Sequence, residues 1–323
     1  MFANQNPKTS FVIPTWNGRH LLEECLPSLK EQRDQDFEVI IVDNGSDDGT
    51  IPFLKREYPQ IKVINLKEKS GFAIPVNRGI QAAKGQYIVL LNNDVVLDPL
   101  WLTNLIKRLD QNKEIGFCAC LMLNKDGEKV DSAGDGFSWW GRVYPIGRGN
   151  DPKDYQEEKL IFGACGGASI WRKEVFNTVG YLDEDFYAYF EDTDLSFRAQ
   201  LAGFKCLYVP SAFCYHKGSA TFEKDSPKMR FIGNRNKDWV IFKNYPLRYL
   251  ILKFPKLVLT KIKSLLTDMR QGLFASGVKA NLTVLSSLSQ TLKKRKIIQK
   301  QKVVSSKYLN SIISNSHPKL KKG

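Results

Sequence analysis

The sequence predicts an α/β protein in which a mostly parallel mixed sheet is flanked by helices and followed by a basic helical extension. Up to Asp94, short apolar runs alternate with segments of helical period, which is typical of βαβ units. The apolar runs end on acids, amides and glycines. The net charge of +14 is concentrated in the tail, because the chain from Val240 onward has 18 basic residues and one acid.

The first part of the chain supplies the parallel strands. Strands are expected at residues 10–15, 37–42, 61–66 and 87–91, and helices at 21–29, at 51–57 and after Ser70. Pro27 should shorten or kink the first helix. The run 87–91 stops abruptly on Asn92, Asn93 and Asp94. Because the carboxyl ends of parallel strands form one edge of a sheet, these polar loops should converge in a crevice. A solvated turn is the plainer explanation of any one loop.

The middle of the chain is less regular. A helix at 101–109 and a strand at 115–123 precede a polar, glycine-rich region at 124–158. Its Trp139, Trp140 and Tyr144 either face a substrate from a loop or hairpin or pack in the core. The small residues at 163–169 allow a ligand or another backbone to approach closely. A strand at 204–209 leads toward His216.

Residues 180–194 are rich in acids and aromatics and run into a helix that carries Leu195 and Leu201. Glu191 and Asp192 lie at the expected start of that helix. Carboxylates in this position either carry out chemistry or cap the helix and interact with its dipole.

The six cysteines are scattered and form no Cys-x-x-Cys pair, so we interpret them as reduced thiols of a cytosolic protein. The amino-terminal residues lack the basic and apolar segments of a signal peptide. No uncharged apolar run reaches the roughly 20 residues of a membrane-spanning helix.

Five motifs in order resemble the inverting glycosyltransferases of family 2. They are residues 12–18 (VIPTWNG), 42–50 (VDNGSDDGT), 91–94 (LNND), 166–168 (GGA) and 191–194 (EDTD). The resemblance covers residues 8–235 and implies the GT-A nucleotide-sugar-binding fold, with a catalytic domain at 1–237. Residues 163–169, the Asn-Asn-Asp form and residues 215–219 (YHKGS) look most like rhamnosyltransferase-like and galactofuranosyltransferase-like members.

The resemblance also implies site residues. The donor nucleotide would be bound by Pro14, Thr15, Asn17, Asp43, Gly71, Asn77, Asn92 and Asn93. Asp43 would accept the ring N–H of the base. A divalent cation, Mn or Mg, would be held by Asp94 and His216 and would neutralise the diphosphate. Here Asn92 replaces the first carboxylate of the family's Asp-x-Asp pattern, so the affinity for metal is expected to be modest.

The acceptor side follows from the same match. Asp192 would be the catalytic base, since inverting transfer needs a group that takes the proton of the acceptor hydroxyl. The acceptor would be positioned by Gly166, Gly167, Glu191 and Asp194. The activity implied is transfer of L-rhamnose from dTDP-rhamnose to a lipid-linked or polysaccharide acceptor.

Three other functions stay open. One is a hexosyltransferase or galactofuranosyltransferase that uses a UDP-sugar. Another is a nucleic-acid-binding protein that uses the basic tail, which we consider unlikely because the charge lies outside a near-neutral domain. The third is an inactive scaffold. The sequence predicts no oligomeric state.

The tail at 238–323 alternates apolar residues with cations, as a helix lying in a membrane interface does. Pro246 and Pro255 should divide it into short helices. Each Lys or Arg near an anionic leaflet contributes about 1 kcal/mol, so the tail is expected to hold the protein at the inner face of the cell membrane. The alternative is a solvated face of a packing helix. The basic run at 293–302 has no assigned partner.

Overall fold

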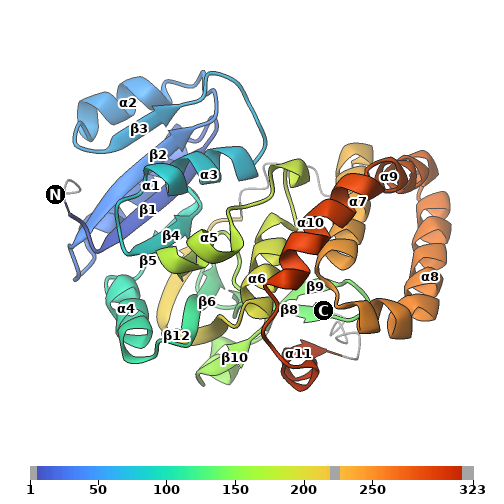
Figure 1. Ribbon diagram of the computed structural model, residues 1–323. Helices are drawn as coiled ribbons and strands as arrows, with labels where there is room; N and C mark the ends of the chain where they lie inside the picture. Colours follow the sequence, from blue (N-terminus) through green and yellow to red (C-terminus); the bar gives the residue numbers. More distant parts are fainter. Residues whose placement is uncertain (1–5, 219–225, 315–323) are drawn as a thin grey trace.

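A ten-stranded mixed sheet forms the centre of the protein in a computed structural model that describes residues 6–218 and 226–314 (Figure 1). The strand order is β10-β12-β6-β11-β4-β1-β2-β3, with β5 on β12 and β7 on β6. The bounds are β1 (Thr9–Thr15), β2 (Phe37–Asp43), β3 (Lys62–Asn65), β4 (Tyr87–Leu91), β5 (Val95–Leu97), β6 (Ile115–Asn124), β7 (Val130–Ser132), β10 (Lys159–Ile161), β11 (Ala168–Arg172) and β12 (Lys205–His216). Strands β4, β1, β2 and β3 are parallel, whereas β11 runs antiparallel to β4 and β6. The predicted fold class is confirmed.

Helices cover both faces of this sheet and extend beyond it. The bounds are α1 (Arg19–Lys30), α2 (Thr50–Glu57), α3 (Ala73–Ala82), α4 (Trp101–Gln111), α5 (Lys173–Val179), α6 (Glu191–Leu201), α7 (Pro227–Asn244), α8 (Leu247–Arg270), α9 (Phe274–Ser286), α10 (Leu288–Lys300) and α11 (Ser306–Ile312). A small second sheet consists of β8 (Asp135–Ser138), β9 (Val143–Pro145) and β13 (Ile313–Ser314). Single-turn 3₁₀ helices span Pro152–Tyr155 and Glu184–Phe186.

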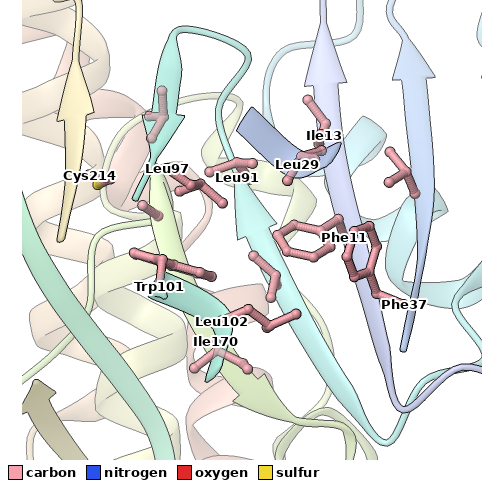
Figure 2. Packing of buried hydrophobic residues seen from close by; sticks show 14 of the residues in the cluster. Phe11, Ile13, Leu29, Phe37, Leu91, Leu97, Trp101, Leu102, Ile170 and Cys214 are labelled. Carbon is pink, nitrogen blue, oxygen red and sulfur yellow. The ribbon is translucent and has the colours of Figure 1, made fainter. Parts of the chain in front are cut away.

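The alternation of apolar side chains along the parallel strands builds two cores. Phe11 and Ile13 of β1 face the core shared with α1 and α4, whereas Val12 between them faces the opposite core. Figure 2 shows Phe11 beside Phe37, whose rings meet edge to face at 5.0 Å. Burial on both faces explains why these strands are almost continuously apolar in sequence.

The predicted division of the tail at Pro255 was wrong, and the first helix is not shortened at Pro27. Helix α1 continues through Pro27 to Lys30, and α8 continues through Pro255 to Arg270. In α1, four apolar side chains are buried against the sheet, and this packing outweighs the roughly 3 kcal/mol cost of an internal proline. Pro246 does separate two helices, since it is the residue before the first turn of α8.

The carboxyl-terminal helices share a third core with the preceding part of the chain. The Trp139 ring stacks on Tyr249 at 4.0 Å, and Phe137 packs edge to face on Tyr245. The packing interpretation therefore holds for Trp139, which is fully buried. The predicted division between residues 237 and 238 falls inside α7, so the helical extension begins earlier than expected.

Part of the basic run at 293–302 is used within the protein. Lys294 forms ion pairs with Asp183 and Asp185, each at 2.6 Å. Arg295 donates hydrogen bonds to the carbonyls of Phe242 and Tyr245. These ion pairs and hydrogen bonds hold α10 against the segments at 183–185 and 242–245. Across residues 6–218 and 226–314, we find no helix long and apolar enough to cross a bilayer.

Candidate active site

A cavity of about 370 Å³ opens where β1 and β4 end and α6 begins. It brings together eleven of the predicted residues: Pro14, Thr15, Gly71, Asn92, Asn93, Asp94, Gly166, Gly167, Glu191, Asp192 and His216. The wall is completed by residues that the sequence did not single out, among them Trp16, Lys69, Cys165 and Tyr189. The convergence of loops expected from the sheet topology is therefore present.

One wall of the cavity is formed by the first two strands. Thr15 lies opposite Asp43 in the register of β1 and β2, and its Oγ1 accepts a hydrogen bond from Asn93 Nδ2 at 2.8 Å. Asp43 is fully buried behind this wall and accepts a hydrogen bond from Ser46 N through Oδ2. No donor in the described part of the chain reaches Asp43 Oδ1. A buried acceptor without a donor is what a ring N–H of a nucleoside base would satisfy.

Gly71 and Asn17 shape the loops at this wall. Gly71 has φ +82°, and a Cβ added there would lie 2.5 Å from the Tyr187 carbonyl oxygen, so only glycine fits. Asn17 does not line the cavity. Its Oδ1 instead accepts the Asp47 N–H at 2.9 Å and joins two loops.

The structure does not bring Asn77 to the cavity. This side chain is buried. Its Nδ2 donates hydrogen bonds to the Leu182 carbonyl and to Glu184 Oε1, and its Oδ1 accepts one from Leu182 N. It holds the segment before α6 against α3. An inward-facing amide on a helix that opens beside a glycine-rich loop looks the same in sequence whether it binds a ligand or the chain itself.

Asp194 also lies outside the cavity. It is fully buried and forms ion pairs with Arg198 at 2.8 Å and Lys243 at 2.9 Å. Burial alone would raise its pKa, but Lys243 and Arg198 hold it below the ordinary value. Asp194 thus joins α6 to α7 instead of facing an acceptor.

We expect Asp194→Ala to destabilise the protein by about 3–5 kcal/mol, because it leaves buried Lys243 and Arg198 with fewer partners. Urea unfolding followed by circular dichroism measures this loss. Asp185→Ala is the matched control. It removes a half-exposed ion pair with Lys294 and should cost no more than about 1 kcal/mol. A variant of Asp194 with wild-type stability and impaired turnover would restore the predicted role in positioning the acceptor.

Asp94 and His216 face each other in the lining of the same cavity. His216 ends β12 and pairs in register with Val95, which brings its Nε2 to 3.3 Å from Asp94 Oδ2. Its Nδ1 lies 2.9 Å from Asp131 Oδ2. Two ligands at right angles on an ion with bonds of about 2.1 Å would be about 3 Å apart, so the pair fits one divalent cation.

Asp131 is a residue that the sequence analysis missed. Carboxylates that accept the second N–H of a metal-binding histidine fix its tautomer and orientation. Burial disfavours the charged His216 ring, yet its hydrogen bonds to Asp131 and Asp94 raise its pKa from 6.5 to about 9. Nothing in the polar region around residue 131 marks it in sequence, because the pairing depends on a strand register.

Asp192 stands at the start of α6 with its carboxylate in the cavity. Its Oδ2 accepts a hydrogen bond from Gly166 N at 3.1 Å, and its Oδ1 accepts one from Thr193 N at 2.7 Å. The residue before the helix is Phe190, and no side chain caps this end. Glu191 and Asp192 are therefore not N-caps, although both lie in the first turn, where the helix dipole stabilises negative charge.

The neighbouring acids Glu191 and Asp192 both have raised pKa values, for partly different reasons. Burial and the charge of Asp192 raise the pKa of Glu191 to about 8, and Glu191 Oε2 has no partner among the described residues. Burial also raises the pKa of Asp192, but three hydrogen bonds oppose the rise. A pKa of about 8 favours the protonated form of Glu191 at neutral pH.

The loop that delivers these acids is strained and firmly held. Tyr187, Tyr189 and Phe190 all have positive φ between 63° and 72°. Asn236 of α7 donates hydrogen bonds to the carbonyls of Phe186, Ala188 and Tyr189 at 2.8–2.9 Å. A helix from the carboxyl-terminal extension therefore fixes the geometry of the site, which the sequence did not indicate.

Asp135 and Cys165 lie close to Asp192. One ligand atom of each and one of Asp192 all lie within 4.8 Å of one another. Burial and the charge of Asp192 raise the pKa of Asp135 well above its ordinary value. Asp135 and Asp192 are thus two close carboxyl groups, and each disfavours the charged form of the other.

The cavity lies at the ends of β1 and β4 and is lined by the carboxylates of Asp94 and Asp192 and by the imidazole of His216. Residues 10–180, more than half of the chain, match the family model described as "Glycosyl transferase family 2". The chain belongs to this family and is a glycosyltransferase, as predicted.

Relatives and solved structures agree with this assignment. The chain is 26% identical over 263 residues to "N-acetylglucosaminyl-diphospho-decaprenol L-rhamnosyltransferase" of Mycobacterium tuberculosis, which covers 71% of this chain and 85% of that protein. It is 28% identical to "O-antigen biosynthesis protein RfbC" of Myxococcus xanthus, over 68% of this chain and 18% of that protein.

Two solved structures share the fold. A mannosyltransferase from Pyrobaculum calidifontis, solved "in complex with GDP-Man and Mn2+", has a TM-score of 0.55 at 16% identity and covers 92% of this chain and 86% of its own. GalNAc-T7 "with UDP, GalNAc and Mn2+" has a TM-score of 0.59 at 17% identity, over 74% of this chain and 48% of its own.

Proposed function

We propose that the protein is an inverting, metal-dependent glycosyltransferase that moves L-rhamnose from dTDP-rhamnose to a lipid-linked or polysaccharide acceptor. The observation that carries the proposal is that Asp192 faces the same cavity as the Asp94–His216 pair. The printed activity of the mycobacterial relative supports the donor sugar and a lipid-linked acceptor.

In this reaction the acceptor hydroxyl oxygen attacks the anomeric carbon on the face opposite the diphosphate. The new C–O bond forms as the bond to the diphosphate breaks, and the hydroxyl proton passes to Asp192. Gly166 N orients the receiving carboxylate. Glu191, Gly166 and Gly167 line the same side, where they would contact the acceptor.

The donor would lie along the wall formed by Pro14, Thr15, Gly71, Asn92 and Asn93, with Asp43 at the base. A divalent cation held by Asp94 and His216 would neutralise the departing diphosphate. Mn and Mg both accept oxygen ligands. The titles of two structural neighbours, which name Mn, support a cation of this kind.

Asp131→Asn should weaken Mn binding by about 10–100-fold, because the amide cannot accept the His216 N–H in the same way and leaves the ring poorly oriented. Calorimetric titration of Mn in the presence of dTDP measures the change. Arg148→Gln is the control, since Arg148 is another ion-pair partner of Asp131 and contacts neither Asp94 nor His216 in any ion pair of the described residues. Unchanged Mn affinity in Asp131→Asn would show that His216 does not bind the metal.

The donor is tested by thermal shift with dTDP and with UDP, each with Mn. We expect dTDP to raise the unfolding temperature more than UDP at equal concentration. The larger shift with UDP would favour the alternative of a UDP-hexose or UDP-galactofuranose donor. No shift with either nucleotide, and no release of nucleoside diphosphate from the sugar nucleotides, would indicate an inactive scaffold.

We also propose that the helical extension attaches the protein peripherally to the inner face of an anionic membrane. Large apolar side chains of α8 lie exposed, among them Leu252 at 59% and Leu259 at 56%, and lysines alternate with them. Co-sedimentation with phosphatidylglycerol vesicles should exceed that with neutral vesicles. Binding to DNA or RNA without vesicle binding would instead favour the nucleic-acid alternative.

A further inference from the structure

Helices α7, α8 and α9 lie away from the parallel strands (Figure 1). An apolar groove with a cavity volume of about 630 Å³ is lined by residues of these three helices. Its lining is mostly apolar. The residues that matter below are Trp140, Ile241, Leu250, Ile251, Phe254 and Leu257. A volume of about 630 Å³ lies within the usual range of ligand-binding pockets.

A second pocket, of about 490 Å³, adjoins the groove and is cationic. The two share Trp140, Lys237 and Thr260. The second pocket adds Arg142, Arg230 and Lys263, and none of its described lining residues is an acid. Arg230 is neutralised by the buried Asp268. Within residues 6–218 and 226–314, no ion pair engages Arg142, Lys237 or Lys263.

Lys237 stands where the two pockets meet. Burial lowers its pKa, which shows that its surroundings penalise the ammonium charge. The next residue in the chain, Asp238, forms an ion pair with Lys261. An anion placed beside Lys237 would supply the missing counter-charge.

The cationic pocket reaches the active site through the strained loop. Tyr189 and Glu191 line the catalytic cavity, and Phe190 between them lines the cationic pocket. A molecule in the groove could thus extend through the cationic pocket toward Asp192. Along this path the apolar groove comes first, the cationic pocket second and the catalytic cavity third.

We propose that the groove and the cationic pocket form one binding site for an amphiphilic acceptor, with a long hydrocarbon chain in the groove and its phosphate or diphosphate beside Arg142, Lys237 and Lys263. Calling the ligand an acceptor rests on the proposed function. The pairing of an apolar groove with adjoining unpaired cations fits a lipid phosphate, because the groove would take the hydrocarbon chain and the cations would take the phosphate.

Titration of the full-length protein with farnesyl diphosphate tests the site. The experiment is done below the micellar concentration and with saturating dTDP, so that the donor cavity is occupied. We expect farnesyl diphosphate to bind saturably and at least about tenfold more tightly than inorganic diphosphate or farnesol. Inorganic diphosphate has only the anionic group and farnesol has only the hydrocarbon chain. Lys237→Met should weaken farnesyl diphosphate by about tenfold and leave farnesol unchanged.

A matched pair of variants on α8 separates the groove from the general apolar surface. Ile251→Glu places a carboxylate in the groove and should weaken farnesyl diphosphate by about tenfold or more. Leu252→Glu is the control, since Leu252 is similarly exposed, at 59%, but does not line the groove. Both positions are exposed, so both variants should fold.

Three outcomes would overturn this site: no saturable binding of farnesyl diphosphate, equal affinity for inorganic diphosphate, or equal weakening by Leu252→Glu and Ile251→Glu. The last would mean that the lipid adsorbs to exposed α8 as to a bilayer. The thermal shift with dTDP is the independent readout. If dTDP binds and farnesyl diphosphate does not, the lipid site is wrong and the proposed function stands. If farnesyl diphosphate binds and dTDP does not, the proposed function is wrong and the lipid site stands.

Discussion

Asp192→Asn should reduce the rate of sugar transfer by about 10²–10⁴-fold and leave dTDP affinity within about twofold of wild type. The amide has nearly the shape of the carboxylate and can still accept the Gly166 N–H. It cannot take up the proton of the acceptor hydroxyl. Initial rates of dTDP release with acceptor present, together with calorimetric titration of dTDP, measure the two quantities.

Glu191→Gln is the comparison for this variant. Because the raised pKa of Glu191 keeps a proton on its carboxyl at neutral pH, an amide resembles its working state and should cost far less than the change at Asp192. Near wild-type turnover in Asp192→Asn would exclude Asp192 as the base. A larger loss in Glu191→Gln than in Asp192→Asn would transfer the role to Glu191.

His216→Ala and Asp94→Asn should each weaken Mn binding by more than about 100-fold, since loss of an outer partner alone costs 10–100-fold. Each removes one of the two protein groups that face each other at 3.3 Å. Turnover at low Mn should fall in parallel and recover in part at high Mn. His20→Ala is a matched control, because His20 lies outside the cavity.

The same histidine sets a pH dependence. The metal needs the neutral ring, so Mn affinity should rise with pH up to about 9, the raised pKa of His216. In metal-free protein the sign is opposite. The charged ring stabilises the fold fully below pH 6.5, and this contribution is lost as the pH rises through about 9. Mn affinity independent of pH between 6 and 9 would contradict the pairing.

The sheet and the positions of its loops could be predicted because strands buried on both faces have almost continuously apolar sequences. The run at 87–91 forms β4, and Asn92 to Asp94 emerge at the cavity as expected. Strand order then brings distant loops together without any further signal. The pairing of Asp94 with His216, 122 positions apart, needed the resemblance to the family as well.

The residues that escaped prediction are those whose roles depend on packing between elements. Asp194 and Asn77 are polar residues at the expected positions, yet both bind other parts of the chain. Asp194 forms an ion pair with Lys243 of α7, and Asn77 donates a hydrogen bond to the Leu182 carbonyl. Asp131 and Asn236 act through other residues and carry no motif of their own. Burial and partners distinguish such groups from ligand-binding ones, and a single sequence gives neither.

The carboxyl-terminal extension shows the same limit. Its amphipathic composition was apparent, but Pro255 does not interrupt α8, and Trp239 of α7 lies in the third core. Composition cannot say which of many apolar residues find a partner within the chain. The exposed Ile251 and buried Tyr249 are separated by one residue and differ only in the direction they face.

The most direct test of the account is a crystal of the protein soaked with dTDP and Mn and measured at the Mn absorption edge. We predict one anomalous peak within bonding distance of Asp94 Oδ2 and His216 Nε2, in contact with the diphosphate, with the thymine N–H on Asp43. A peak instead among Asp135, Cys165 and Asp192 would contradict the account, since the proposed base would then be a metal ligand.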